Sequence, residues 1–283
     1  MNNRRLIGAG VIALVLGTPA WAASKGPIQI KPPKTFPVVI SQPGSYQLIG
    51  NLTVPTAVPA IQIDASNVTL DLNGFTVQAG TASGTLASGI NATNTSQRNI
   101  TVKNGVVHGF NGSGVNLSGS GHVVTDVKAE GNALHGIQVF VGSIVERCTV
   151  TGNGLHGITT DTSCAIKDNV CTGNGSDGIH VRQSGTVLQN TCNGNGADGI
   201  VTEGGSTAIQ NNCSGNAGNG IACVGSNNSI VDNTCLQKEV GGINLGSVGS
   251  NYAAQNKLGG NVTAIVNAGG NTLGAGDLAN VTF

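Results

Sequence analysis

Apolar and polar residues alternate in short runs along most of the chain, and Gly, Asn, Ser and Asp separate one run from the next. Ile179 and Val181 flank one polar residue, and Ile243 and Leu245 flank another. No stretch shows the roughly 3.6-residue period of an amphipathic helix. A period of two that is interrupted by turn-forming residues predicts short β-strands joined by turns.

A unit of about 21 residues repeats through the middle of the chain and is marked by the dipeptide Gly-Ile. Its isoleucines recur at constant steps, of which only the last is longer by one: Ile137, Ile158, Ile179, Ile200, Ile221 and Ile243. The segments GNALHGI, GNGLHGI, GNGSDGI, GNGADGI and GNAGNGI contain the first five of them. A unit of this length holds three short strands, and stacked units bury a face that one unit cannot bury alone. We therefore expect a parallel β-coil with strands of successive turns about 4.8 Å apart.

Stacked coils place equivalent residues above one another, and the repeat has the columns that this arrangement needs. Residues 13 positions before each Gly-Ile isoleucine are apolar, and residues eight positions before it are small or apolar. The first column contains Val124, Val145, Ile166, Val187, Ala208 and Ile230. The second column contains Ala129, Val150, Cys171, Cys192, Cys213 and Cys235. We expect both columns to face the core.

Two further columns consist of asparagines, at positions ten and five before the isoleucines. The ten-back column contains Asn169, Asn190, Asn211 and Asn233, and the five-back column contains Asn132, Asn153, Asn174, Asn195 and Asn216. Stacked amides can hydrogen-bond from coil to coil and satisfy buried turns. The alternative is a polar strip that binds a ligand, and we favour the structural ladder.

The four cysteines Cys171, Cys192, Cys213 and Cys235 share one inward column. Their spacing allows disulfides by distance, but in-register parallel strands point both side chains the same way and would strain the bridge. We favour a stack of buried thiols that act as small hydrophobic groups. A zinc site is the alternative, but the chain lacks the closely spaced cysteine pairs that such sites use.

From Val68 to Val248 the chain resembles the right-handed parallel β-helix repeat family, which includes pectate lyases and alginate epimerases. The resemblance rests on the GNGxDGI-like turns, the asparagine columns, and the phrases NVTLDLNGFTV and NITVKNGVVHGF, which begin at Asn67 and Asn99. It implies an all-β, single-domain solenoid with a right-handed coil. Around it we expect an N-terminal cap over residues 23–63, repeats over 64–250 and degenerate final coils over 251–283. The cap would cover strand edges that otherwise invite aggregation.

Residues 1–22 have the pattern of a signal peptide. Arg4 and Arg5 precede an apolar run that ends at Leu16, and the segment from Ala20 to Ala22 fits the small-x-small cleavage rule. The run is too short to span a bilayer comfortably, and no later segment approaches that length. We expect a periplasmic or extracellular protein without a membrane span.

Composition narrows the function further. Of the 283 residues, 13 are Lys or Arg, 13 are Asp or Glu, and only 3% are aromatic. Loss of Arg4 and Arg5 would leave a net charge of about −2, so a basic surface for nucleic acid is not expected. Aromatic residues that stack on sugars are almost absent, and Phe110 and Phe140 are the main candidates.

The strand after each Gly-Ile dipeptide carries the candidate catalytic residues. If the isoleucine faces inward, the residues one and three positions later face outward. Asp161, His180, Arg182 and Glu203 then lie on one face of three successive coils. Paired carboxylates beside His and Arg suit acid–base chemistry on sugars, Arg suits a uronate carboxylate, and an acidic pair suits Ca²⁺. An ordinary solvated row of charges is the alternative.

A second column stands two residues before each isoleucine: His135, His156, Asp177, Asp198 and Asn219. Its histidines and aspartates could bind a metal ion, and we take Asp177 and Asp198 as the candidate metal ligands. The alternative is that Asp or Asn is simply what a tight turn before Gly-Ile prefers.

The residues that define the enzyme branches of the resembled family are missing. The chain has no DPHD motif of alginate epimerases, no Arg-x-Pro-x-x-Arg or WIDH signature of the main pectate lyases, and no GHG of polygalacturonases. No catalytic residue is therefore carried over. Two functions remain: binding, and lysis or other modification, of an acidic polysaccharide along the Gly-Ile face, or a non-catalytic adhesin-like solenoid. The first predicts a groove around the charged residues, and the second predicts a flat, uncharged face.

Overall fold

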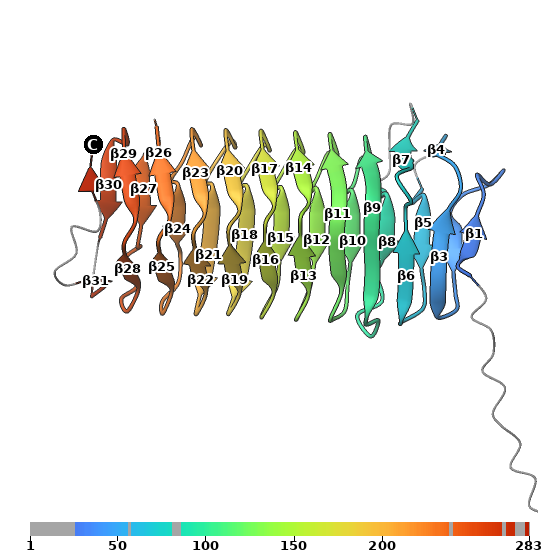
Figure 1. The fold of residues 1–283 in the computed structure, drawn as a ribbon, viewed down its shortest axis with the longest axis horizontal. Coiled ribbons are helices and arrows are strands. Elements are labelled where there is room, and N and C mark those ends of the chain that lie inside the picture. Colours follow the sequence, from blue (N-terminus) through green and yellow to red (C-terminus); the bar gives the residue numbers. More distant parts are fainter. Residues whose placement is uncertain are drawn as a thin grey trace, which may run out of the picture.

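A computed structural model describes residues 26–55, 58–80, 86–237, 240–267, 270–274 and 281–282, the last pair by backbone only. The predicted signal peptide lies outside these residues. The described chain forms parallel strands that stack along one axis and give an elongated molecule (Figure 1). With 11 strands in the smaller sheet, the stack is roughly 50 Å long.

Successive coils contribute strands to three parallel stacks, of which the first two join into one sheet through long strands. The joined sheet contains β1 (Ile28–Ile30), β3 (Gly44–Leu48), β4 (Leu52–Val54), β6 (Val68–Asp71), β7 (Thr76–Ala79), β9 (Ile100–His108), β11 (Val123–Glu130), β13 (Ile144–Glu146), β14 (Thr149–Thr151), β16 (Ala165–Lys167), β17 (Val170–Thr172), β19 (Thr186–Leu188), β20 (Thr191–Asn193), β22 (Thr207–Ile209), β23 (Asn212–Ser214), β25 (Ser229–Val231), β26 (Thr234–Leu236), β28 (Tyr252–Ala254), β29 (Lys257–Gly259), β31 (Thr272–Leu273) and β32 (Val281–Thr282).

The third stack is a separate sheet, and its central strands follow the Gly-Ile dipeptides. It contains β2 (Val38–Ile40), β5 (Ile61–Ile63), β8 (Ile90–Ala92), β10 (Val115–Leu117), β12 (Ile137–Val139), β15 (Ile158–Thr160), β18 (Ile179–Gln183), β21 (Ile200–Gly204), β24 (Ile221–Cys223), β27 (Gly241–Asn244) and β30 (Thr263–Val266). The isoleucines pair directly in register, as Ile158 with Ile179 and Ile179 with Ile200.

The apolar columns form the interior of the coil. Every residue of the two predicted columns is fully buried, and so are the six Gly-Ile isoleucines. Complete burial of one Ile side chain contributes up to about 3 kcal/mol, and stacking repeats this contribution in each coil. The sequence expectation for the core is therefore confirmed.

The asparagine columns are ladders inside the turns. The Oδ1 atom of Asn174 accepts hydrogen bonds from the backbone N–H of Asn153 at 3.1 Å and from Asn153 Nδ2 at 2.9 Å. Its own Nδ2 donates to Val150 O at 3.1 Å and to Asn195 Oδ1 at 3.0 Å. The side chain thereby uses its whole hydrogen-bonding capacity. A second ladder follows the same scheme through Asn169, Asn190, Asn211, Asn233 and Asn256.

The bend between the first two stacks depends on one left-handed residue per coil. Gln189 has φ 56° and Gln210 has φ 55°, and each directly precedes a ladder asparagine. A non-glycine residue in this region costs about 1–2 kcal/mol. The buried hydrogen bonds of the following Asn side chain offset this cost. The left-handed residue and the ladder asparagine after it therefore act together to form the bend.

All seven cysteines are buried thiols outside any disulfide. Cys171, Cys192, Cys213 and Cys235 pair in register on β17, β20, β23 and β26. Burial raises the pKa of the Cys192 thiol well above its ordinary value. The structure therefore has the expected column of buried thiols, which pack as small hydrophobic groups.

The strands at both ends continue the same stacks. Between residues 28 and 63, β1 pairs with β3, and β2 pairs with β5, in parallel register. Beyond residue 250, β28 pairs with β31 and β29 pairs with β32. Coil geometry thus extends into both predicted end regions, while the boundaries of cap and final coils stay predictions.

Candidate functional site

The strands of the third stack alternate between core and solvent. In β18, the residues on either side of His180 are fully buried, whereas His180 itself is half-buried on the outer side and Arg182 is exposed. Asp161 directly follows β15 and Glu203 lies in β21, the two neighbours of β18. The structure therefore brings the four candidate residues to one face of three adjacent strands, while their catalytic role stays a prediction.

A small hollow of about 70 Å³ opens on this face. It is lined by Gln138, Val139, Phe140, Thr159, Thr160, Asp161 and Arg182. On this measure one water molecule needs about 10–15 Å³, so the hollow has room for a ligand substituent the size of a few water molecules. Phe140 is therefore available to a ligand. Phe110 is only 2% exposed and belongs to the core, so the expectation that it stacks on a sugar is wrong.

His180 lies between two carboxylates. Its Nδ1 is 3.0 Å from Asp177 Oδ2, and its Nε2 is 3.1 Å from Glu203 Oε1. Asp177 stands in the turn that leads into β18, three residues before His180, and Glu203 comes from the next coil. Two turns of the solenoid thus hold the imidazole ring from both sides.

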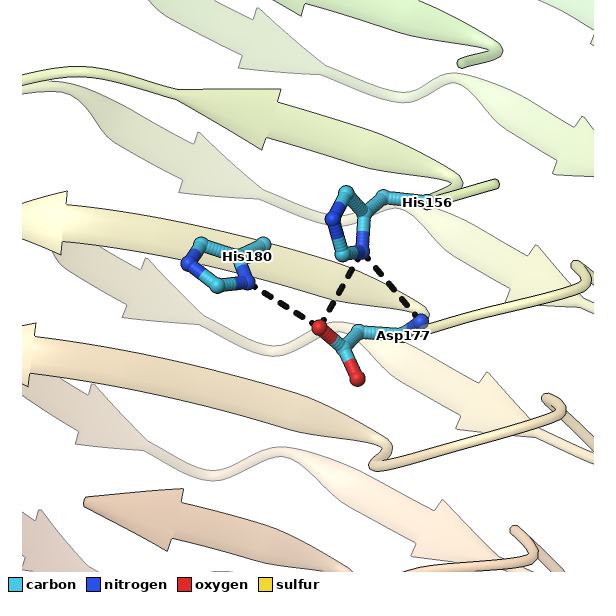
Figure 2. A group of neighbouring side chains, drawn as sticks. All are labelled: His156, Asp177 and His180. Carbon is cyan, nitrogen blue, oxygen red and sulfur yellow. Dashed lines mark hydrogen bonds and ion pairs between the residues drawn. The ribbon is translucent and has the colours of Figure 1, made fainter. Parts of the chain in front are cut away.

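The preceding coil adds His156 to this group. Its Nδ1 lies 3.0 Å from Asp177 Oδ2, and Figure 2 shows both imidazoles directed at the same carboxylate. The backbone N–H of Asp177 also approaches His156 Nδ1, at 3.3 Å. The ring of His135 stacks on that of His156 with centroids 5.2 Å apart and planes 5° from parallel. The row of rings continues to His180 at a centroid distance of 4.8 Å.

The charges of this group are coupled. Burial raises the pKa of the Asp177 carboxyl, but hydrogen bonds from His156, His180 and the Asp198 amide outweigh burial and hold it below its ordinary range. The hydrogen bond to Asp177 raises the pKa of His180; burial opposes this increase, and Glu203 adds to it. Burial, reinforced by the two neighbouring imidazoles, lowers the pKa of His135 to about 4. At neutral pH, Asp177 is therefore ionised and His135 is neutral.

Asp198 continues the column as a turn residue. Asp177 Oδ1 accepts a hydrogen bond from the Asp198 amide at 3.1 Å, and Asp198 Oδ1 in turn accepts from the amide and side chain of Asn219. Each carboxylate thus caps the turn of the following coil, as the turn interpretation expects. The pairing of Asp177 with Asp198 as metal ligands stays a prediction; the geometry instead gathers His156, Asp177 and His180, whose ligand atoms lie within 4.8 Å of one another.

Two columns of the repeat meet at this site, a contact that their spacing in the sequence does not predict. His156 and Asp177 belong to the column two residues before the isoleucines, and His180 belongs to the column one residue after them. The turn leading into β18 folds Asp177 back toward His180, so residues three apart converge. The sequence signal for this contact is the segment DGIH, which runs from Asp177 to His180. One repeat earlier, His156 of the segment HGI stands at the position of Asp177.

A separate charged network covers the first stack. Arg147 contacts Asp126 and Glu146 at 3.0 and 2.9 Å, and Lys167 contacts Glu146 at 2.8 Å. The hydrogen bond from Lys167, and then that from Arg147, lowers the pKa of Glu146. The two acids and two bases of this network pair with one another.

Comparison with known families identifies the architecture. The family model described as right handed beta helix region matches residues 59–214 and 145–280. The chain belongs to the right-handed β-helix family. The handedness implied by the sequence resemblance is thereby confirmed. A search of curated proteins finds no match for this β-helix.

Three solved structures share this fold. The β-helix is 15% identical to the A-module of the Azotobacter vinelandii mannuronan C-5 epimerase AlgE6, with a TM-score of 0.65, covering 88% of this chain and 90% of that one. It is 16% identical to the AlgE4 A-module of the same organism, with a TM-score of 0.57, covering 81% of this chain and 76% of that one. It is 13% identical to a double mutant of the periplasmic alginate epimerase AlgG, with a TM-score of 0.59, covering 85% of this chain and 65% of that one. At these identities the likeness shows the fold alone.

Within the described part of the β-helix, no helix has the length and apolar character of a transmembrane span.

Proposed function

We propose that this β-helix, exported by residues 1–22, binds an acidic polysaccharide along the outer face of β12, β15, β18 and β21. The observation that carries the proposal is an unengaged cation beside a polar hollow. Arg182 is exposed, lines the hollow, and makes no hydrogen bond or ion pair with any residue that the structure describes. Guanidinium groups bind carboxylates in a fixed two-point geometry.

The lining of the hollow suits a sugar. Gln138 and Thr159 provide neutral hydrogen-bonding groups, Asp161 accepts hydrogen bonds from hydroxyls, and Phe140 adds an apolar wall. The volume fits one carboxylate or hydroxyl substituent, so a polymer would lie along the face and insert its substituents one at a time. Three proteins of the same fold are named for action on mannuronan or alginate, which supports this ligand class.

A modification step has one specific support, the position of His180. Its ring is hydrogen-bonded to two carboxylates and keeps a raised pKa, with the bond to Asp177 as the main cause. An imidazole donates a proton to a leaving oxygen in its charged form and accepts one in its neutral form, and the raised pKa favours the charged form. His180 is therefore the group that we assign to proton transfer if the bound polymer is changed.

The binding proposal is tested with size-defined oligouronates and the matched neutral oligosaccharides. We expect saturable binding of the oligouronates alone, and Arg182→Ala should weaken it about tenfold, because one charge-assisted contact at an accessible site is lost. Arg98→Ala removes another exposed arginine, which lies outside this face, and should leave affinity unchanged. Isothermal titration at two salt concentrations measures both effects, and the affinity should fall with ionic strength.

Proton NMR of the same mixtures distinguishes binding from modification. New unsaturated or reducing-end signals, or altered anomeric ratios, that disappear in His180→Asn would establish chemistry at this face. Unchanged spectra with retained binding would make the protein a binding module. If the titrations show no binding of any oligosaccharide and the spectra stay unchanged, the adhesin-like solenoid becomes the better description.

A further inference from the structure

We infer that His156 Nδ1, Asp177 Oδ2 and His180 Nδ1 form a binding site for a divalent transition-metal ion of the Zn²⁺ type. The inference does not depend on the proposed glycan binding, because it uses neither Arg182 nor the hollow. It shares His180 with the proposed proton transfer, and a metal ion on Nδ1 would take the place of the proton between Nδ1 and Asp177. Three elements position the ligands: the turn before β15, the turn before β18, and β18 itself.

The ligand atoms already converge. Asp177 Oδ2 lies 3.0 Å from each Nδ1, and all three atoms lie within 4.8 Å of one another. Tetrahedral zinc at about 2.0–2.1 Å from its ligands separates neighbouring ligand atoms by about 3.3 Å. The two N–O distances need to widen by only a few tenths of an ångström, and the two Nδ1 atoms, which lie within 4.8 Å of each other, need to approach to the same separation.

The chemistry of the three atoms calls for a positive partner. The ionised carboxylate accepts from both Nδ1 atoms while these carry protons, and a metal ion would replace those protons and bind the freed electron pairs. Imidazole nitrogen with a carboxylate is a ligand set that suits zinc, copper or nickel rather than calcium, which prefers six to eight oxygens. This ligand set therefore favours a transition-metal ion over the Ca²⁺ that an acidic pair was expected to bind.

Neighbouring residues contact each of the three ligands. Glu203 Oε1 lies 3.1 Å from His180 Nε2, the pairing by which a carboxylate fixes the tautomer of a metal-bound histidine. Asp198 holds the second oxygen of Asp177 through its amide at 3.1 Å. The parallel ring of His135 packs on His156, and its buried Nδ1 has no partner among the described residues.

The site is covered but not sealed. The side chains of His156 and His180 are 23% and 22% exposed, and that of Asp177 is 9% exposed. Three protein ligands leave a tetrahedral ion one open position, which is the arrangement of reactive rather than purely structural zinc sites. An ion held here would present that position on the outer side of the third stack.

Titration calorimetry tests the inference on the chelator-treated, purified protein with Zn²⁺ alone as the probe. We expect one saturable site per chain, and no comparable binding of Ca²⁺. Asp177→Asn and His156→Gln should each weaken Zn²⁺ binding at least 100-fold. Glu203→Gln leaves all three ligands in place and should weaken it about 10- to 100-fold. His108→Gln, which removes an imidazole hydrogen-bonded to Gln78 on another stack, is the matched control and should not change it.

Folding and thiol chemistry are controlled separately. Circular dichroism shows whether each variant keeps its β-structure, and Cys213→Ala should retain Zn²⁺ binding because that thiol is fully buried. Folded wild-type protein without saturable Zn²⁺ binding, or a folded Asp177→Asn variant with unchanged affinity, would overturn the inference. Arg182→Ala should keep Zn²⁺ binding and His156→Gln should keep oligouronate binding, so the two proposals fail independently.

Discussion

His122 is a single polar residue whose protonation state is fixed by the fold. It is fully buried, accepts a hydrogen bond from the Ile100 amide at Nδ1 at 3.2 Å, and lies 2.9 Å from Ser118 O at Nε2. These contacts define a neutral ring with its proton on Nε2. Burial lowers the pKa of His122, and the bond to Ser118 only partly opposes this shift.

This lowered pKa predicts a pH-dependent free energy of unfolding. The unfolded chain binds the proton near pH 6.5, whereas the folded chain binds it only at lower pH. The contribution of His122 is therefore complete above pH 6.5 and falls as the pH drops below it. Urea unfolding between pH 8 and pH 5 should give a shallower pH dependence for His122→Gln than for the wild type. Identical slopes would contradict the assignment.

The candidate site shows what residue patterns can and cannot predict. The period of the repeat places Asp161, His180, Arg182 and Glu203 on one face, because strand register follows directly from sequence spacing. It does not place Asp177 against His180, because that contact depends on how a turn folds back. The period also does not distinguish Phe110 from Phe140. Phe110 follows β9 and packs into the core, whereas Phe140 lines the hollow.

At the scale of the element, the asparagine ladder is the feature that links one coil to the next. Asn174 makes four side-chain hydrogen bonds to three residues of its neighbouring coils and is 1% exposed. An aspartate in its place has the same size but cannot donate. Val150 O and Asn195 Oδ1 would then lose a donor, and a carboxylate would stand beside both oxygens.

We therefore expect Asn174→Asp to lower the free energy of unfolding by roughly 3 kcal/mol or more, since buried acceptors lose their partner and a charge is desolvated. The same substitution at the exposed Asn212 of β23 should change it by less than about 0.5 kcal/mol. Chemical denaturation of both variants measures the difference. Equal effects at the two sites would contradict a stabilising role of the ladder.

The arrangement of strands in three stacks was only partly predictable from the sequence. Columns of Ile, Cys and Asn specify three strands per coil and their inward faces, because every coil repeats the same spacing. The joining of two stacks into one sheet was not predictable. It depends on β9 and β11, which run through the bend without a break where later coils have two strands.

At the scale of the whole molecule, each coil contacts mainly its two neighbours, so stability is close to a sum over coils. Deletion of residues 133–153 removes one complete coil and joins Asn132 to Gly154, a junction identical in sequence to the native step from Asn153. We expect this variant to fold, with a moderately lower melting temperature because one set of interfaces is lost.

Deletion of residues 133–143 is the control. It removes half a coil, places core residues on the wrong stack, and should abolish the cooperative melt. Circular dichroism and thermal unfolding of both variants test the prediction. If both deletions unfold the chain, the coils are not interchangeable units.

The asparagine ladders also give the solenoid a direction. Along both ladders, Nδ2 of one coil donates to Oδ1 of the coil that follows it, from Asn132 toward Asn216 and from Asn169 toward Asn256. The side-chain dipoles therefore add head to tail, as peptide dipoles do in a helix, and neighbouring bonds polarise one another. The two ends of the scaffold are thus electrically unequal. A polymer that has different ends of its own would not bind equally well in both orientations along this axis.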